Sequence, residues 1–158
     1  QALQDVFRNI GRSMAELNMP KVALVHGTIR GSKVSADQPD RPMGLDIDIS
    51  ALSEMGCDFY CVGHVHLAQS WKATNGAPIC TPSSPFYCDW GEAKQEKSYL
   101  LVEFEESLDT SPIVVGDTLT EIDGSAYYAM SYKRIPTSAT PMLLVEAEWN
   151  GTELVIQD

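Results

Sequence analysis

Each histidine in this 158-residue chain lies at the end of an apolar run, and there are only three of them. His26 ends the run Val22–Val25, and His64 and His66 follow the run Phe59–Val62 after a single glycine. Apolar runs of this length are typical of strands buried on both faces. Side chains alternate in an extended segment, so His64 and His66 are expected to project to the same side. The sequence therefore predicts that the imidazoles gather at the ends of buried strands.

Neutral imidazole is the commonest nitrogen ligand for first-row metals, so we predict that His26, His64 and His66 bind metal. Three imidazoles could hold one zinc ion with an open position for water, or belong to a two-metal site whose carboxylates lie elsewhere. No aspartate or glutamate is an immediate neighbour of a histidine, so the sequence alone leaves these alternatives open. A third alternative is a metal-free structural module with hydrogen-bonded histidines.

Charge and cysteine content indicate which partners and which cellular compartment to expect. Eleven basic and 22 acidic residues give a formal charge of −11, which argues against a self-sufficient nucleic-acid-binding surface. Four cysteines without C-x-x-C spacing are expected to be reduced. No apolar run is nearly long enough to cross a bilayer. We therefore expect a cytoplasmic protein with no membrane association.

The pattern along the chain predicts an α/β fold. Apolar spacing predicts helices over 1–17 and 46–55, and Asn75-Gly76 predicts a hairpin turn between strands. Residues 27–44 form a long polar loop in this prediction. Strands are expected at 21–25, 59–62, 68–73, 77–81, 99–104, 113–115, 126–132, 142–149 and 152–156. We place a domain over 1–108 and a small β-rich module over 109–158.

Four segments carry a resemblance to a known family. Residues 25–29 (Val-His-Gly-Thr-Ile) are followed by 56–66, which end in Gly-His-Val-His, then by 81–85 (Thr-Pro-Ser-Ser-Pro) and 90–92 (Trp-Gly-Glu). In this order they resemble the second half of calcineurin-like metallophosphoesterases, in particular SbcD-type nuclease subunits of double-strand-break repair complexes. The resemblance covers roughly residues 1–105. The fold that it implies is half of a layered metallophosphoesterase α/β sandwich, followed by a β-rich capping-like module.

The resemblance also implies roles for the histidines. His26 and His64 would bind the second of two divalent ions, and His66 the first, with Mn²⁺ as the implied metal. The implied reaction is in-line attack of a metal-activated water on a phosphodiester. DNA is the implied substrate, and an SbcC-like ATPase and a second copy of the chain are the implied partners. A phosphoesterase acting on small phosphodiesters or phosphomonoesters is the alternative enzyme.

Several family motifs are missing from the sequence. The family places an Asp-x-His, a Gly-Asp and a Gly-Asn-His before the single histidine. The first and third occur nowhere, and the only Gly-Asp, at 116–117, follows the Gly-His-Val-His. Thr81 and Ser83 also stand where the family has tyrosine and glycine. We therefore expect the other motifs in a preceding segment, no catalytic acid or base among these residues, and no activity from this chain alone.

Overall fold

The computed structural model describes residues 2–34, 46–107, 127–141, 147–149, 152 and 154–156, and these form a mixed α/β fold as predicted. The helices are α1 (Ala2–Met14), α2 (Ile49–Ser53) and a 3-10 turn (Trp90–Glu92). The strands are β1 (Val22–His26), β2 (Thr28–Ile29), β3 (Asp46–Ile47), β4 (Phe59–Gly63), β5 (Gln69–Lys72), β6 (Pro78–Thr81), β7 (Ser98–Ser107), β8 (Tyr127–Pro136), β9 (Ala147–Trp149) and β10 (Leu154–Ile156).

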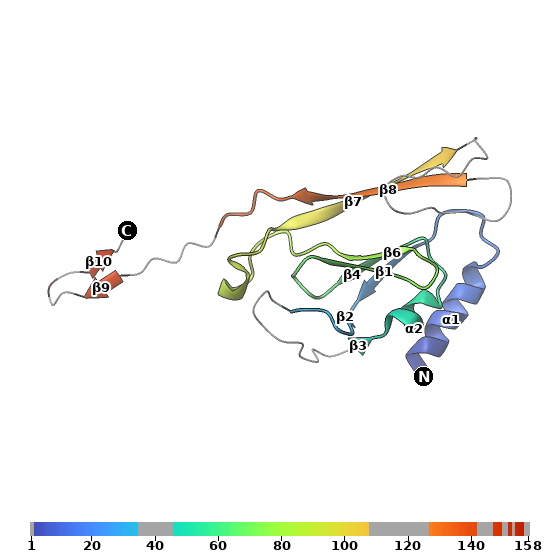
Figure 1. The fold of residues 1–158 in the computed structure, drawn as a ribbon, viewed down its shortest axis with the longest axis horizontal. Helices are drawn as coiled ribbons and strands as arrows, with labels where there is room; N and C mark the ends of the chain where they lie inside the picture. Colours follow the sequence, from blue (N-terminus) through green and yellow to red (C-terminus); the bar gives the residue numbers. More distant parts are fainter. Residues whose placement is uncertain are drawn as a thin grey trace.

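A four-stranded sheet in the order β1-β4-β6-β5 forms the centre of the fold. Figure 1 labels three of its strands, β1, β4 and β6. Strands β1, β4 and β6 are parallel, and β5 pairs antiparallel with β6 at one edge. The hairpin turn between β5 and β6 contains Gly76 at φ 87°, a conformation that glycine adopts readily. The predicted hairpin at Asn75-Gly76 is therefore confirmed.

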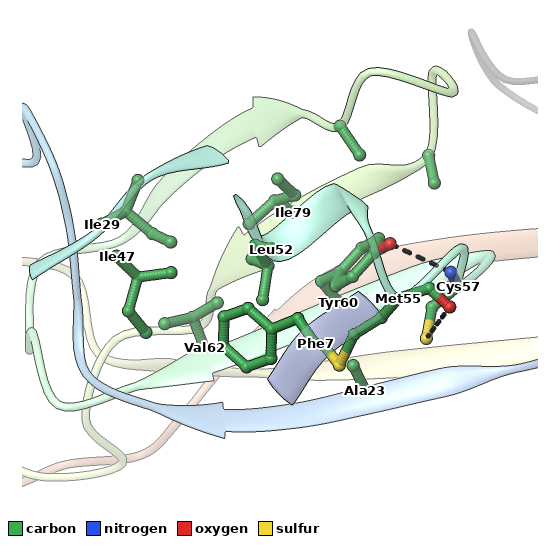
Figure 2. Packing of buried hydrophobic residues seen from close by; sticks show 12 residues of the cluster. Phe7, Ala23, Ile29, Ile47, Leu52, Met55, Cys57, Tyr60, Val62 and Ile79 are labelled. Atoms are coloured by element: carbon green, nitrogen blue, oxygen red, sulfur yellow. Dashed lines mark hydrogen bonds between the residues drawn. The ribbon is translucent and has the colours of Figure 1, made fainter. Parts of the chain in front are cut away.

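Strand β4 is buried on both faces because the sheet lies between two layers. Tyr60 and Val62 face a core to which α1 contributes Phe7 and α2 contributes Leu52 (Figure 2). Within this core the Tyr60 hydroxyl accepts a hydrogen bond from the backbone N–H of Cys57, 2.9 Å away. Burial on both faces explains why this strand is an unbroken apolar run in the sequence.

On the opposite face of the sheet, the antiparallel strands β7 and β8 cover β4 and β6 (Figure 1). Phe59, Cys80 and Met130 form a second buried cluster there, and the rings of Phe59 and Tyr132 lie 5.4 Å apart. β8 pairs with β7 along its whole length, from Tyr127 on Ser107 to Pro136 on Ser98. This pairing joins residues on either side of the expected boundary at 108/109, and the division into two domains stays a prediction.

Strand β1 forms the other edge of the sheet. Within the described residues it pairs only with β4. Ala23 is buried toward the helices, whereas Val22 and Leu24 on the other face are 47% and 82% exposed. The predicted burial of the run 22–25 on both faces is therefore wrong for β1 within the described residues. Parallel sheets are normally covered on both faces, so this edge leaves apolar surface that a neighbouring element would bury.

The predicted helix over 46–55 is too long at its start. Asp46 and Ile47 instead form β3, which pairs in parallel with β2 and aligns Ile47 with Ile29. Both isoleucines are almost completely buried, so side-chain burial outweighs helix spacing here. The helix begins at Ile49 and is followed by Gly56 at φ 61°. Predicted strand 113–115 and most of the predicted loop 27–44 lie outside the described residues.

Helices α1 and α2 approach each other closely at Gly11. A Cβ atom at this position would lie 2.3 Å from the carbonyl oxygen of Glu54. Any other residue at position 11 would therefore push the helices apart.

We expect Gly11→Ala to lower the free energy of unfolding by about 1–3 kcal/mol, the usual cost of overpacking. In a helix without such a contact, alanine would instead stabilise relative to glycine. Urea unfolding measures the difference, and Asn9→Ala on the exposed side of α1 is the matched control. Equal or greater stability of Gly11→Ala would contradict the close approach.

An ion pair also links these helices. Arg8 Nε and Nη2 donate to the two carboxylate oxygens of Glu54 at 3.1 Å, and Gln4 donates at 3.0 Å. The hydrogen bonds from Arg8 and then Gln4 lower the pKa of Glu54 below its ordinary 4.5, against the opposing effect of desolvation.

A carboxyl group whose pKa is lowered on folding stabilises the protein above its unfolded pKa and loses that contribution as pH falls through the folded value. We therefore expect Glu54→Gln to have a lower melting temperature than the wild type in thermal unfolding at pH 7. This difference in melting temperature should disappear below about pH 4. Glu16→Gln, at an exposed position after α1, is the control. A gap that persists unchanged at pH 3 would show that the ion pair is not its cause.

Candidate functional site

His26 and His64 meet at the carboxyl ends of two neighbouring parallel strands. The register of β1 on β4 aligns His26 with Gly63, so His64 is the next residue beyond that pair. The two imidazole rings stand edge to face with their centroids 5.1 Å apart. His26 is exposed and His64 is half-buried. The sheet register thus places two imidazoles side by side, although they are 38 positions apart in the sequence.

The backbone turns sharply at His64. Strand β4 ends at Gly63, and His64 has φ 106°, in the left-handed region that non-glycine residues rarely occupy. The segment after Gly63 is therefore not extended, and the alternation expected for His64 and His66 does not apply to it. Such strained conformations occur most often at functional sites.

His66 lies beside an acidic partner, Glu92. Nδ1 of His66 is 2.5 Å from Oε1 of Glu92. His66, Glu92 and Cys88 offer ligand atoms within 4.8 Å of one another, and in the described part of the chain no group of three such residues includes His26 or His64. The structure thus brings His26 to His64 and His66 to Glu92. Binding of metal by His26, His64 and His66 stays a prediction.

The Glu92 carboxylate is buried and fully hydrogen-bonded. Its side chain is 8% exposed. Oε2 accepts from Lys97 Nζ at 2.7 Å and from the backbone N–H of Cys88 at 2.9 Å. Burial by itself raises the pKa of Glu92, but the hydrogen bonds from Lys97, Cys88 and His66 outweigh it and lower the pKa to about 2. Glu92 is therefore an ionised acceptor at neutral pH.

Lys97 organises the turn that carries Glu92. Only 1% of its side chain is exposed, and Nζ donates to Ser84 Oγ at 2.8 Å as well as to Glu92. Nζ also lies 5.2 Å from the centre of the Tyr87 ring, within cation–π range. The ammonium group is therefore satisfied by side chains from both ends of the connection between β6 and β7.

Ser83 attaches this connection to the backbone of His66. Its hydroxyl lies 2.9 Å from the carbonyl oxygen of His66 and 3.2 Å from that of Glu96. Ser83 has φ 96°, which is strained for a residue with a side chain. His66 is thus held twice, through its ring by Glu92 and through its backbone by Ser83.

The four cysteines are all free. Burial raises the pKa of Cys57 to about 11, and burial also raises the pKa of Cys61 and of Cys80. Burial thus disfavours the thiolate, which is the nucleophilic form, at all three positions. Cys88 is the exposed one.

Sequence reasoning did not assign Glu92 and Lys97 to the site, because Glu92 lies 26 residues from His66. Position alone gave no reason to connect them. The available signal was the Trp90-Gly91-Glu92 turn, which carried part of the family resemblance without a role for its glutamate.

No protein-family model matches this sequence, and no curated protein is significantly similar to it. None of the helices in the described ranges has the length and apolar character needed to cross a bilayer.

The Glu92–Lys97 pair gives a stability test. We expect Lys97→Met to lower the free energy of unfolding by about 3–5 kcal/mol, because it leaves a buried carboxylate without its cation. The double variant Glu92→Leu/Lys97→Met removes both charges and should recover much of this loss. Urea unfolding measures these two variants and Glu92→Leu alone, with exposed Lys94→Met as the control. A double variant as unstable as the sum of its two single variants would contradict the coupling.

Proposed function

We propose that this chain supplies part of a two-metal phosphodiesterase centre, most specifically that of a DNA nuclease subunit of the SbcD type. In this proposal the α/β layers are half of a metallophosphoesterase sandwich. The observation that carries it is the juxtaposition of His26 and His64 at the carboxyl ends of adjacent parallel strands. In open parallel sheets, ligands bind just beyond the carboxyl ends of the strands.

Local geometry supports the same proposal. Ser83 adopts a positive φ at the position where the family's turn has glycine, so the backbone there has the conformation that a glycine would favour. His64 is also held at a positive φ, next to the second imidazole. Backbone strain of this kind is maintained where the surrounding structure and the function require it.

The donor atoms fit divalent first-row metals. His26 and His64 offer adjacent imidazoles, and His66 has one ring nitrogen on a carboxylate, as metal-bound histidines usually do. Divalent ions, with Mn²⁺ as the candidate, would neutralise phosphate charge and lower the pKa of a bound water. The three histidines would bind and orient, and further carboxylates and a proton donor would come from residues outside this chain.

The edge strand β1 supports this last point. It pairs only with β4 in the described ranges and leaves Val22 and Leu24 exposed beside His26. An additional α/β element placed against this edge would bury that apolar surface and would bring its own loops to the same end of the sheet. An SbcC-like ATPase and a second copy of the chain are the partners in this proposal.

The acidic charge favours a second candidate, a phosphoesterase acting on small phosphodiesters or phosphomonoesters. A formal charge of −11 opposes DNA binding unless a basic surface is supplied elsewhere. The two candidates share the metal site and differ only in substrate.

The test compares this chain with a version extended by the sequence encoded ahead of Gln1. We expect Mn²⁺-dependent phosphodiester hydrolysis from the extended version and none from the 158 residues alone. Cleavage of linear duplex DNA against a small chromogenic phosphodiester separates the two substrates.

In the extended version, His64→Ala should lower kcat/KM at least about 100-fold, because a metal ligand is lost. Asn75→Ala in the distant β5–β6 turn is the control and should retain activity. Full activity of His64→Ala would refute the assignment. Absence of Mn²⁺ binding in the extended version would favour a metal-free structural module.

A further inference from the structure

The hydrogen in the contact between His66 and Glu92 could be bonded to either of two atoms, Nδ1 of the imidazole or Oε1 of the carboxylate. Oε1 of Glu92 lies 2.5 Å from Nδ1 of His66. Oε2 of the same carboxylate is paired with the buried Lys97 ammonium and with the backbone N–H of Cys88. An ionised carboxylate has no hydrogen to donate, so the hydrogen in the contact belongs to Nδ1.

A metal ion does not fit between these two atoms. Ligands on a tetrahedral zinc ion, with bonds of about 2.0–2.1 Å, lie about 3.3 Å apart. The observed separation is shorter by most of an ångström, and it is also below the usual range of about 2.7–2.9 Å for a charge-assisted N–H···O hydrogen bond. The two atoms are therefore in direct hydrogen-bond contact. In this arrangement Nδ1 of His66 and Oε1 of Glu92 are therefore joined by a hydrogen bond, rather than being two ligands of one ion.

We propose that Glu92 is a positioning residue that holds His66 as its Nδ1–H tautomer and thereby presents Nε2 to a metal ion. In a neutral imidazole with hydrogen on Nδ1, the lone pair is on Nε2. The metal half of this inference rests on the proposed function, whereas the tautomer is a property of the metal-free chain.

Two features make the arrangement effective. Lys97 is itself anchored on Ser84, so Glu92 keeps its charge and position whether or not a ligand is present. The His66 side chain is 41% exposed, which leaves the ring accessible from solvent. A carboxylate behind a histidine ligand fixes its orientation and raises its basicity, and removal of such a partner typically lowers metal affinity about 10–100-fold.

The test uses ¹⁵N-histidine-labelled protein without metal at neutral pH. Long-range ¹H–¹⁵N spectra distinguish the protonated from the unprotonated ring nitrogen, and three single His→Ala variants assign the three rings. We expect His66 as the Nδ1–H tautomer. In Glu92→Leu/Lys97→Met, which removes both buried charges and so avoids an unpaired ammonium, we expect the Nε2–H form that free histidine prefers.

Glu96→Gln, an exposed carboxylate in the same turn, is the control and should keep the wild-type spectrum. The proposal is overturned if wild-type His66 is protonated on Nε2, or if the double variant retains the Nδ1–H form. Either result is independent of metal binding.

Addition of Mn²⁺ to the version extended ahead of Gln1 then tests whether Nε2 of His66 binds metal, through paramagnetic broadening of the signals of His26, His64 and His66. We expect His66 to broaden in the wild type and to need about 10–100-fold more Mn²⁺ in the double variant. The expected tautomer without broadening of any histidine would overturn both the proposed function and the role of Nε2. A weaker response in Cys88→Ser would overturn the proposal in favour of direct binding by the His66, Cys88 and Glu92 group.

Discussion

The parallel pairing of β1 with β4 is the constraint on which the rest of the structure depends. It aligns His26 with Gly63 and so places two imidazoles together at one end of the sheet. The same pairing buries β4 between the helix layer and the β7–β8 hairpin, which fixes the strand in position. A shift of one residue would turn the buried side chains of β4 to the opposite faces. Core packing and site geometry are therefore set by one register.

A second unit, the connection from Thr81 to Ser98, supports His66 from the other side. Ser83 contacts its backbone, and Glu92 contacts its ring. The buried Lys97 ammonium joins Glu92 to Ser84. Buried charge pairs rarely add net stability compared with apolar packing. In this protein the buried pair instead fixes geometry, because a fully hydrogen-bonded network allows only one orientation of the carboxylate that faces His66.

The sequence was informative where one local signal dominated. The apolar run 59–62 predicted the central strand correctly, because burial on both faces selects apolar residues. The Asn75-Gly76 pair predicted the hairpin correctly, because a positive φ selects glycine. The start of the predicted helix at Asp46 was wrong, since Ile47 is buried through pairing with a distant strand. Likewise, the contact of His66 with Glu92 depends on a chain reversal that no local pattern specifies.

In the proposed function, His26 and His64 bind a divalent ion where β1 and β4 end. The most direct measurement is anomalous diffraction from crystals grown with Mn²⁺, using the chain extended by the sequence encoded ahead of Gln1. We expect an anomalous peak within coordination distance of an imidazole nitrogen from each of these two rings. Ordered rings with no peak beside them, or rings whose nitrogens are hydrogen-bonded to the backbone, would contradict it.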